Sequence, residues 1–193
     1  LKDFNNAISN FNNAIDGDYD FAYAYNERAS SKMRIGDIQG AIQDFKKAVS
    51  YNDHLPFAYN NLGNAQLQAS DYEEAINNFS KAIELDPNYY KSYINRGRAK
   101  TIMENYEEAI SDLKKAIKIH SGNAKAYNNL GIVYLKQMEF KEAIQQFNKA
   151  IEQDDSLSEA YLNRGMAREN LGDLEKACKD WKMAKELGLD KAG

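Results

Sequence analysis

Cysteine and proline are both scarce in this chain, which has one cysteine, Cys178, and two prolines, Pro56 and Pro87, among 193 residues. A single cysteine excludes an internal disulfide and a metal site built from several cysteines. Both prolines fall between predicted helices, where a missing N–H costs little. No run approaches the roughly 18 apolar residues of a membrane-spanning helix, so the sequence predicts a soluble chain without a membrane span.

An excess of basic residues is also absent. The chain has 25 Lys and Arg against 29 Asp and Glu, a net charge of −4, and a pI near 5.3. A general nucleic-acid binder is usually basic. This balance therefore argues against nucleic acid as the partner.

An internal repeat runs through the chain instead. Similar segments begin, at constant spacing, at residues 22, 56, 90, 124 and 158, and we number the positions of each copy from that residue. Position 4 is always tyrosine, and positions 20 and 27 are always alanine. Position 8 is small and position 24 large and apolar: Ala29 with Phe45, Gly63 with Phe79, Gly97 with Leu113, Gly131 with Phe147, and Gly165 with Trp181. Large and small residues on facing positions interlock, so each copy is predicted to be a packed helix pair.

The copies resemble the tetratricopeptide repeat. The residues that match its pattern best are Leu62, Gly63, Tyr72, Ala75, Phe79, Ala82 and Pro87, and then Leu130, Gly131, Tyr134, Ala143, Phe147 and Ala150. The chain departs from the pattern at position 7, where Arg28, Arg96 and Arg164 replace leucine. The resemblance implies an all-α fold, a right-handed superhelical solenoid of antiparallel helix pairs.

We expect one continuous array over residues 1–193. Residues 1–21 are a partial repeat with a second helix only, full repeats span 22–55, 56–89, 90–123 and 124–157, and residues 158–193 form a terminal repeat with a C-terminal cap. In each copy the first helix is expected over roughly positions 1–14 and the second over positions 17–31. Lys185 replaces an isoleucine on the side that would meet a further repeat, so we expect the array to end there.

The leading helix lacks the first helix that would cover its apolar face. Phe4, Ala7, Phe11 and Ala14 repeat the apolar positions of a second helix, and such a face must be buried against something. We therefore expect either a fragment of a longer array or another copy on this face, which would give a homo-oligomer through residues 1–17.

Groups that carry out catalysis are sparse. His54 and His120 fall in predicted loops without evident partners, whereas a catalytic histidine needs a positioned partner. Cys178 occupies an apolar repeat position, so we expect it to be buried and unreactive. Neither a glycine-rich phosphate loop nor a paired-histidine zinc motif occurs. We predict that the chain is not an enzyme and has no cofactor or metal.

The surface predicted to bind a partner is the first-helix face, by which we mean positions 2, 5, 6, 9, 12 and 13 of each copy. The resemblance places this face on the concave side of the solenoid. Position 6 carries an asparagine in four successive copies: Asn61, Asn95, Asn129 and Asn163. Their amides offer donors and acceptors that suit the backbone of an extended peptide. The alternative is that they bond within the solenoid or to water.

Charge and aromatic residues add to this face. Lys91, Arg98, Lys125 and Lys136 make its centre basic, which favours an acidic peptide segment or a free carboxylate; an ordinary solvated face is the alternative. Tyr23 and Phe57 at position 2 are candidate contacts for an apolar ligand side chain.

Family members that bind chaperone tails clamp a terminal carboxylate with two asparagines and three cations. This chain resembles them at Asn64, Asn95 and Lys125 but has Asn60 and Asn129 where two of the cations are needed. Because charge-assisted bonds would carry such recognition, this chemistry disfavours the clamp.

We predict a protein-interaction scaffold whose groove holds an extended peptide or a partner helix through Asn61, Asn64, Lys91, Asn95, Arg98, Lys125, Asn129 and Asn163. The alternatives are a structural module that self-assembles through its N-terminal edge, or a regulatory domain of a larger protein. RNA recognition is disfavoured, since related repeats usually have a basic groove. Abundant Asn, Lys and Ile with little Pro is typical of bacterial arrays and leaves the compartment, cytoplasm or envelope, open.

Overall fold

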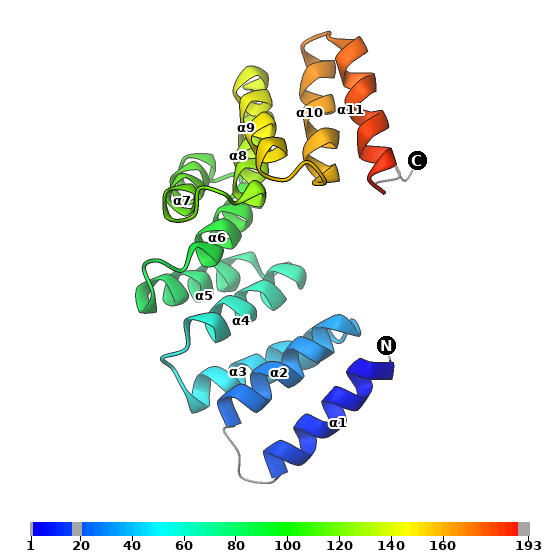
Figure 1. The fold of residues 1–193 in the computed structure, drawn as a ribbon. Helices are drawn as coiled ribbons and strands as arrows, with labels where there is room; N and C mark the ends of the chain where they lie inside the picture. The colour runs from blue at the N-terminus through cyan, green and yellow to red at the C-terminus, as the bar shows by residue number, and fades with distance from the viewer. Residues whose placement is uncertain (1, 17–20, 189–193) are drawn as a thin grey trace. The chain divides into compact units, whose positions relative to one another are not determined.

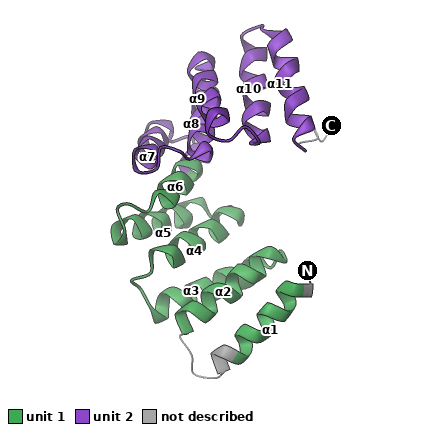
Figure 2. Ribbon diagram, viewed as in Figure 1, with its two compact units in different colours: residues 1–99 green, residues 100–193 purple. Residues whose placement is uncertain are grey.

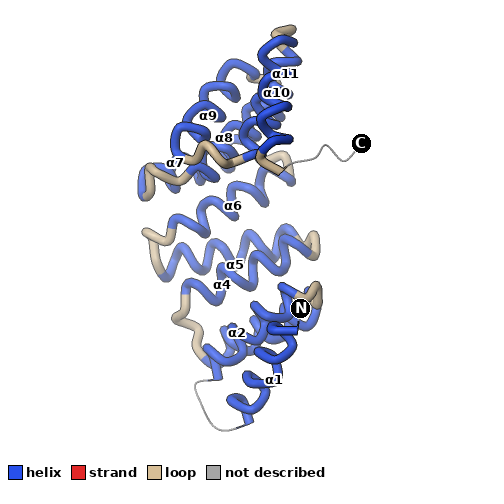
Figure 3. Tube along the Cα trace, turned by 45° about the vertical axis from the view of Figure 1, so that its right-hand side comes forward, coloured by secondary structure: helices blue, strands red, loops and turns tan. Residues whose placement is uncertain are grey.

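The computed structural model describes residues 2–16 and 21–188, and every regular element in this part of the chain is a helix (Figures 1 and 3). In chain order the helices are α1 (Lys2–Asp16), α2 (Phe21–Arg34), α3 (Ile38–Tyr51), α4 (Pro56–Gln68), α5 (Tyr72–Leu85), α6 (Tyr90–Ile102), α7 (Tyr106–Ile119), α8 (Ala124–Lys136), α9 (Phe140–Gln153), α10 (Ser158–Asn170) and α11 (Leu174–Glu186). The prediction of an all-α fold is confirmed.

The helices belong to two compact units, residues 1–99 and residues 100–193 (Figure 2). In the first unit α2 packs against α3 and α4 against α5. In the second unit α8 packs against α9 and α10 against α11. These are the antiparallel pairs that the repeat predicts, with α2, α4, α6, α8 and α10 as first helices. The expectation of one continuous array over both units stays a prediction.

The glycine at position 8 lies against the ring at position 24 in the copies that begin at residues 56 and 124. A Cβ atom added to Gly63 would lie 2.6 Å from Cε1 of Phe79, and one added to Gly131 would lie 2.6 Å from Cε1 of Phe147. Carbon atoms do not pack at that distance, so these two positions have no room for a side chain. The predicted interlocking of small and large residues is therefore present in both units.

The alanines at positions 20 and 27 are fully or almost fully buried in every complete copy, while the tyrosines at position 4 are less uniform. Tyr25 and Tyr93 are buried, but Tyr59, Tyr127 and Tyr161 are half-buried. Position 4 therefore lies at the margin of the core rather than inside it.

The turn between the two helices of each copy places position 15 in the left-handed region of backbone space. The residues there are Gly36 (φ 86°), Ser70 (φ 65°), Glu104 (φ 62°), Met138 (φ 62°) and Gly172 (φ 79°). A left-handed residue after a helix lets the next N–H groups bond to the last carbonyls. Glycine adopts this conformation without steric cost, so the other three positions are strained.

Burial of Cys178 was predicted, and this is wrong: Cys178 is exposed. It stands at position 21 of its copy, on α11. The same position on α9 holds Ile144, which is half-buried in a cluster that includes Ala167 of the following copy. No further copy follows α11 in the described residues, so the side of α11 that carries Cys178 and Lys185 is exposed.

The two chain ends are described in part. On α1, Phe4 is 37% exposed and Phe11 is half-buried. The predicted contributions of Ala14 and of residues 17–20 lie outside what is described. So does the end of the predicted C-terminal cap, residues 189–193.

Candidate functional site

One group of cations lies between the two helices of a copy, half-buried or buried, and is paired. In the first unit, Asp44 of α3 accepts hydrogen bonds of 2.7 Å from Nε and Nη2 of Arg28, and Lys32 Nζ lies 2.8 Å from it. The Asp44 side chain is 3% exposed. Burial raises the pKa of Asp44, but hydrogen bonds from Arg28 and Lys32 outweigh it, so the pKa lies below its ordinary value of 3.8.

The second unit repeats this arrangement. Arg164 and Arg168 approach Asp180 to 2.7 and 2.8 Å, and Lys100 lies 2.9 Å from Asp112. Each of these acids is buried. In both units, these cations form ion pairs with buried carboxylates and so stabilise the packing of paired helices.

These ion pairs explain the departures from the family pattern at position 7. The copies with arginine there carry aspartate at position 23 and a cation at position 11, whereas the copies with leucine carry an amide at position 23. Asn78, for example, donates to Gln66 Oε1 at 2.7 Å. Charged and neutral copies therefore alternate along the chain. Sequence reasoning missed this, although the joint alternation of positions 7, 11 and 23 was visible.

Each position-7 arginine also donates to position 25 of the copy before it. Nη1 of Arg28 bonds to Asn12 at 2.7 Å, Nη1 of Arg96 to Ser80 at 2.8 Å, and Nη1 of Arg164 to Asn148 at 2.7 Å. This contact joins one copy to its neighbour. Arg28 and Arg164 therefore connect neighbouring copies as well as the two helices of their own copy.

Three of the position-6 asparagines use one donor inside the protein. Each bonds through Nδ2 to Oδ1 of the position-5 asparagine in the preceding copy: Asn61 to Asn26 at 3.1 Å, Asn95 to Asn60 at 2.9 Å, and Asn163 to Asn128 at 3.2 Å. The position-5 partners are 2 to 7% exposed. The alternative of bonding within the solenoid thus holds for these donors, while the Oδ1 atoms of these half-buried residues accept no hydrogen bond from another described residue.

Asn129 differs from the other three. The position-5 residue of the copy before it is Ile94, whose side chain has no acceptor. Asn129 is half-buried, and its amide bonds to no other side chain in the described residues. Both polar atoms of its side chain are therefore available to a ligand or to water.

A second group of cations lies on the first-helix face and is unpaired. Lys91, Arg98, Lys125 and Lys136 are exposed, and none forms an ion pair with another described residue. The first two belong to the first unit and the last two to the second. Each unit therefore presents positive charge on the face that the sequence predicts to bind a ligand.

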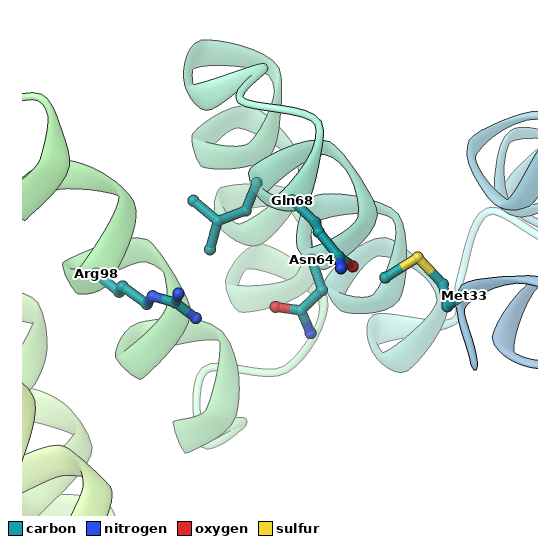
Figure 4. Close-up of a pocket in the computed structure, with 5 residues that line it drawn as sticks. Met33, Asn64, Gln68 and Arg98 are labelled. Atoms are coloured by element: carbon teal, nitrogen blue, oxygen red, sulfur yellow. The ribbon is translucent and has the colours of Figure 1, made fainter. Parts of the chain in front are cut away.

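A pocket of about 350 Å³ opens on this face within the first unit (Figure 4). It is lined by Met33 of α2, Asn64, Leu67 and Gln68 of α4, and Arg98 of α6. All five stand at positions 9, 12 or 13 of first helices. The structure thus brings together two of the predicted site residues, Asn64 and Arg98, and adds three that sequence reasoning did not select.

The polar groups of this pocket are unsatisfied within the protein. The Arg98 side chain extends from α6 toward Asn64 (Figure 4), and Gln68 and Met33 line the same pocket. The side chains of Asn64, Gln68 and Arg98 form no hydrogen bond with any other described residue. Leu67 is 9% exposed and supplies an apolar wall. The pocket therefore offers one positive charge and two amides beside apolar surface.

An aromatic pair lies on the same face and in the same unit. The rings of Tyr23 on α2 and Phe57 on α4 have centroids 5.4 Å apart and are tilted by 35°. Tyr23 is 47% exposed. The two position-2 residues thus form one aromatic surface that is open to solvent at Tyr23. Their contact with a ligand stays a prediction.

Asn60, which stands where the chaperone-tail clamp needs a cation, is bound within the first unit. Asn60 is 4% exposed, and its Oδ1 accepts from Asn95 at 2.9 Å and from Ser92 at 3.1 Å. Asn60 therefore serves the contact between copies and is not available to a carboxylate. This placement agrees with the sequence argument against such a clamp.

A metal site needs clustered ligands, and a membrane span needs a long apolar helix. Among the described residues, no cluster of three or more His, Cys, Asp or Glu could hold a metal ion, and no helix is long and apolar enough to cross a membrane. His54 does have a neighbour, since its Nδ1 contacts Asp53, but both side chains are exposed. The expectation of a partnerless His54 is corrected accordingly.

Comparison with known proteins gives one consistent family. Models of the tetratricopeptide repeat match residues 22–54, 56–89, 78–111, 124–157 and 147–179, and a model described as the TPR repeat matches residues 97–137. No curated protein matches the chain.

Solved structures of similar fold include MamA, at 29% identity and a TM-score of 0.70 over 82% of this chain and 93% of that one. YrrB, described as a TPR protein with an unusual peptide-binding site, is 23% identical with a TM-score of 0.67 and coverage of 94% and 93%. TTC0263, a thermophilic TPR protein of Thermus thermophilus, is 20% identical with a TM-score of 0.77 and coverage of 86% and 91%. The last two show the fold alone. With its regular copies, its interlocked helix pairs and these matches, the chain belongs to the tetratricopeptide repeat family.

Proposed function

We propose that this chain is a protein-interaction scaffold that holds an extended, acidic peptide on its first-helix face. Tetratricopeptide repeat proteins are in general protein-interaction scaffolds. The observation that carries the proposal is the pocket of Met33, Asn64, Leu67, Gln68 and Arg98, since its polar side chains make no hydrogen bond with other described residues. A polar group that stays unpaired beside apolar surface suits a ligand that completes its bonds.

The unpaired cations support an acidic ligand. Lys91 and Arg98 in the first unit and Lys125 in the second are exposed on this face without ion-pair partners among the described residues. Asn129 and the Oδ1 atoms of Asn61, Asn95 and Asn163 supply further groups that suit a peptide backbone. In this proposal the chain has no catalytic role.

Binding to a random decapeptide library, read by display selection, tests the proposal. We expect enrichment of peptides rich in Asp and Glu, and Arg98→Glu should weaken the selected peptides about tenfold, which corresponds to about 1.4 kcal/mol. Lys81→Glu is the control, because Lys81 lies on the second helix α5 and is paired with Glu84. Selection of no peptides, or binding that Arg98→Glu leaves unchanged, would refute the proposal.

A second candidate function is self-assembly through residues 1–17. The observation in its favour is Phe4, which is 37% exposed on a helix whose other described apolar residues are at best half-buried. An exposed aromatic side chain on an amphipathic helix favours contact with another surface. In this proposal a second copy of the chain covers α1.

A further inference from the structure

We propose that the first unit recognises a two-anchor linear motif: an aromatic or long aliphatic residue on the Tyr23–Phe57 surface, and a Glu or Asp side chain at Arg98, three to five positions away along the peptide. This rests on the proposed function and specifies its ligand. Each anchor and the spacing between them follow from separate observations.

The acidic anchor is defined by the pocket. Arg98 is the cation of the pocket, and its guanidinium has no ion-pair partner among the described residues. Guanidinium groups bind carboxylates through two parallel hydrogen bonds. Asn64 and Gln68 add amide donors that a carboxylate oxygen can accept from. Met33 and Leu67 supply apolar contact for the methylene groups of the ligand side chain, so Glu fits this pocket better than Asp.

The apolar anchor is defined by the aromatic pair. Tyr23 and Phe57 stand at the same position of adjacent first helices and form one surface, with ring centroids 5.4 Å apart. Tyr23 remains 47% exposed in that arrangement. Exposed aromatic side chains at a binding surface contribute strongly when a ligand removes them from water. A Phe, Trp, Leu or Met of the ligand would cover both rings.

The spacing between the anchors follows from α4, which carries residues of both. Phe57 lies in the first turn of this helix, and Asn64 and Gln68 lie in its second half. At a rise of about 1.5 Å per residue, Asn64 and Gln68 are roughly 10 to 16 Å from Phe57 along the helix axis. An extended peptide spans about 3.3 Å per residue. Three to five peptide residues therefore cover the distance.

Charge distinguishes this site from an ordinary solvated surface. Arg28 and Lys32, on α2 of the same unit, are bound to Asp44, and the acidic residue of the first-helix face on α2, Glu27, accepts a hydrogen bond from Asn26. Arg98 is not neutralised in this way. A carboxylate from a ligand would give it the partner that the paired cations already have.

The test is a set of synthetic decapeptide pools in which one Phe and one Glu are fixed at separations of one to eight residues and the other positions are randomised without acidic or aromatic residues. Binding to the full chain is measured by fluorescence polarisation. We expect the affinity to peak at separations of three to five and to be about tenfold higher there than at one or eight. Replacement of Glu by Gln should remove the peak.

Variants assign each anchor. Arg98→Glu should reverse the preference, so that a pool with Lys in place of Glu binds better than the original pool. Because this is a gain of binding, it cannot result from misfolding. Tyr23→Ser should abolish the preference for Phe over Ser in the pool while the preference for Glu remains. Lys81→Glu on α5 should change neither preference.

The outcomes separate the two proposals. Acidic peptides that bind at every separation with equal affinity would overturn the two-anchor motif and leave the proposed function standing. Failure of every pool and of the random library to bind would overturn both. A peak at three to five that Arg98→Glu leaves in place would also overturn the motif, because another cation would then be the acidic anchor.

Discussion

At the scale of single residues, the most consequential contact is that of the buried Asp44 with Arg28 and Lys32. Folding takes this carboxylate out of water, and the two cations must make up for the lost hydration. Asp44→Asn keeps the size of the side chain but removes its charge. We expect the variant to be less stable at neutral pH by about 2–3 kcal/mol, since hydrogen bonds to charged groups are lost and two cations stay half-buried. Urea unfolding followed by circular dichroism measures this loss.

The same variant gives a pH test. Because the pKa of Asp44 is depressed in the folded state, its stabilisation is complete above the ordinary value of 3.8 and is lost as the pH falls through the folded-state pKa. The stability difference between the two proteins should therefore be constant from pH 7 to about 5 and shrink as the pH falls below about 4. A difference that does not change with pH would contradict a charged Asp44. Glu84→Gln, in an exposed ion pair with Lys81, serves as the control and should leave the unfolding midpoint unchanged.

At the scale of elements, the turns between paired helices store strain that a single substitution relieves. Met138 has φ of 62° and is 76% exposed, so its side chain contributes little packing. We expect Met138→Gly to raise stability by about 0.5–1 kcal/mol, because glycine adopts the left-handed conformation without the steric cost of a Cβ atom. Gly36→Ala, at the equivalent position with φ of 86°, should lower stability by a similar amount. A destabilised Met138→Gly variant in urea unfolding would refute this account.

The contact between positions 8 and 24 sets how closely two helices approach. We expect Gly63→Ala to cost about 1–3 kcal/mol by overpacking against Phe79, and Gly63→Val to cost more. The copy that begins at residue 22 already has an alanine at position 8, Ala29, which lies in one buried cluster with Phe45. We therefore expect the cost of Gly63→Ala to fall at the low end of this range. The second change Phe79→Leu should recover part of the loss, as thermal unfolding of single and double variants will show. If Gly63→Ala lowers stability equally with and without Phe79→Leu, the Phe79 ring is not what the added methyl group meets.

Element by element, the sequence predicts much of the fold and less of the site. Helix bounds follow from the spacing of small and large residues, because positions such as Gly63 and Phe79 must meet. The contacts of Asp44 with Arg28 and of Asn60 with Asn95 were not predicted. The residue types at the two positions of each contact vary together, and this is visible only when the copies are compared with one another. The Asn95 donor was assigned to a ligand, yet a buried acceptor in the preceding copy binds it first. The pocket depends on five side chains from three helices, and only their geometry shows that Arg98 and Asn64 share it.

At the scale of the whole molecule, the proposed self-assembly and the proposed peptide binding use different surfaces. If residues 1–17 mediate self-assembly, Phe4→Asp should convert a concentration-dependent dimer to a monomer in multi-angle light scattering, because burying a carboxylate in an apolar contact is costly. Peptide binding by this variant should be unchanged. A wild-type chain that is monomeric at all concentrations would exclude the self-assembly proposal and leave the first-helix face as the functional surface.

The alternation of charged and neutral copies constrains how such a chain can change its length. Position 25 carries a lysine in each charged copy, Lys46, Lys114 and Lys182, and an uncharged Asn12, Ser80 or Asn148 in the copy before each arginine. Removing residues 56–89 alone would bring Arg96 to the copy that carries Lys46, so that two cations meet where a hydrogen bond now forms. Removing residues 56–123 would instead place Leu130 after the copy that carries Lys46, which is the place that Leu62 has now. The pair of copies is therefore the smallest piece of the chain whose gain or loss keeps position 7 matched to position 25 of the copy before it.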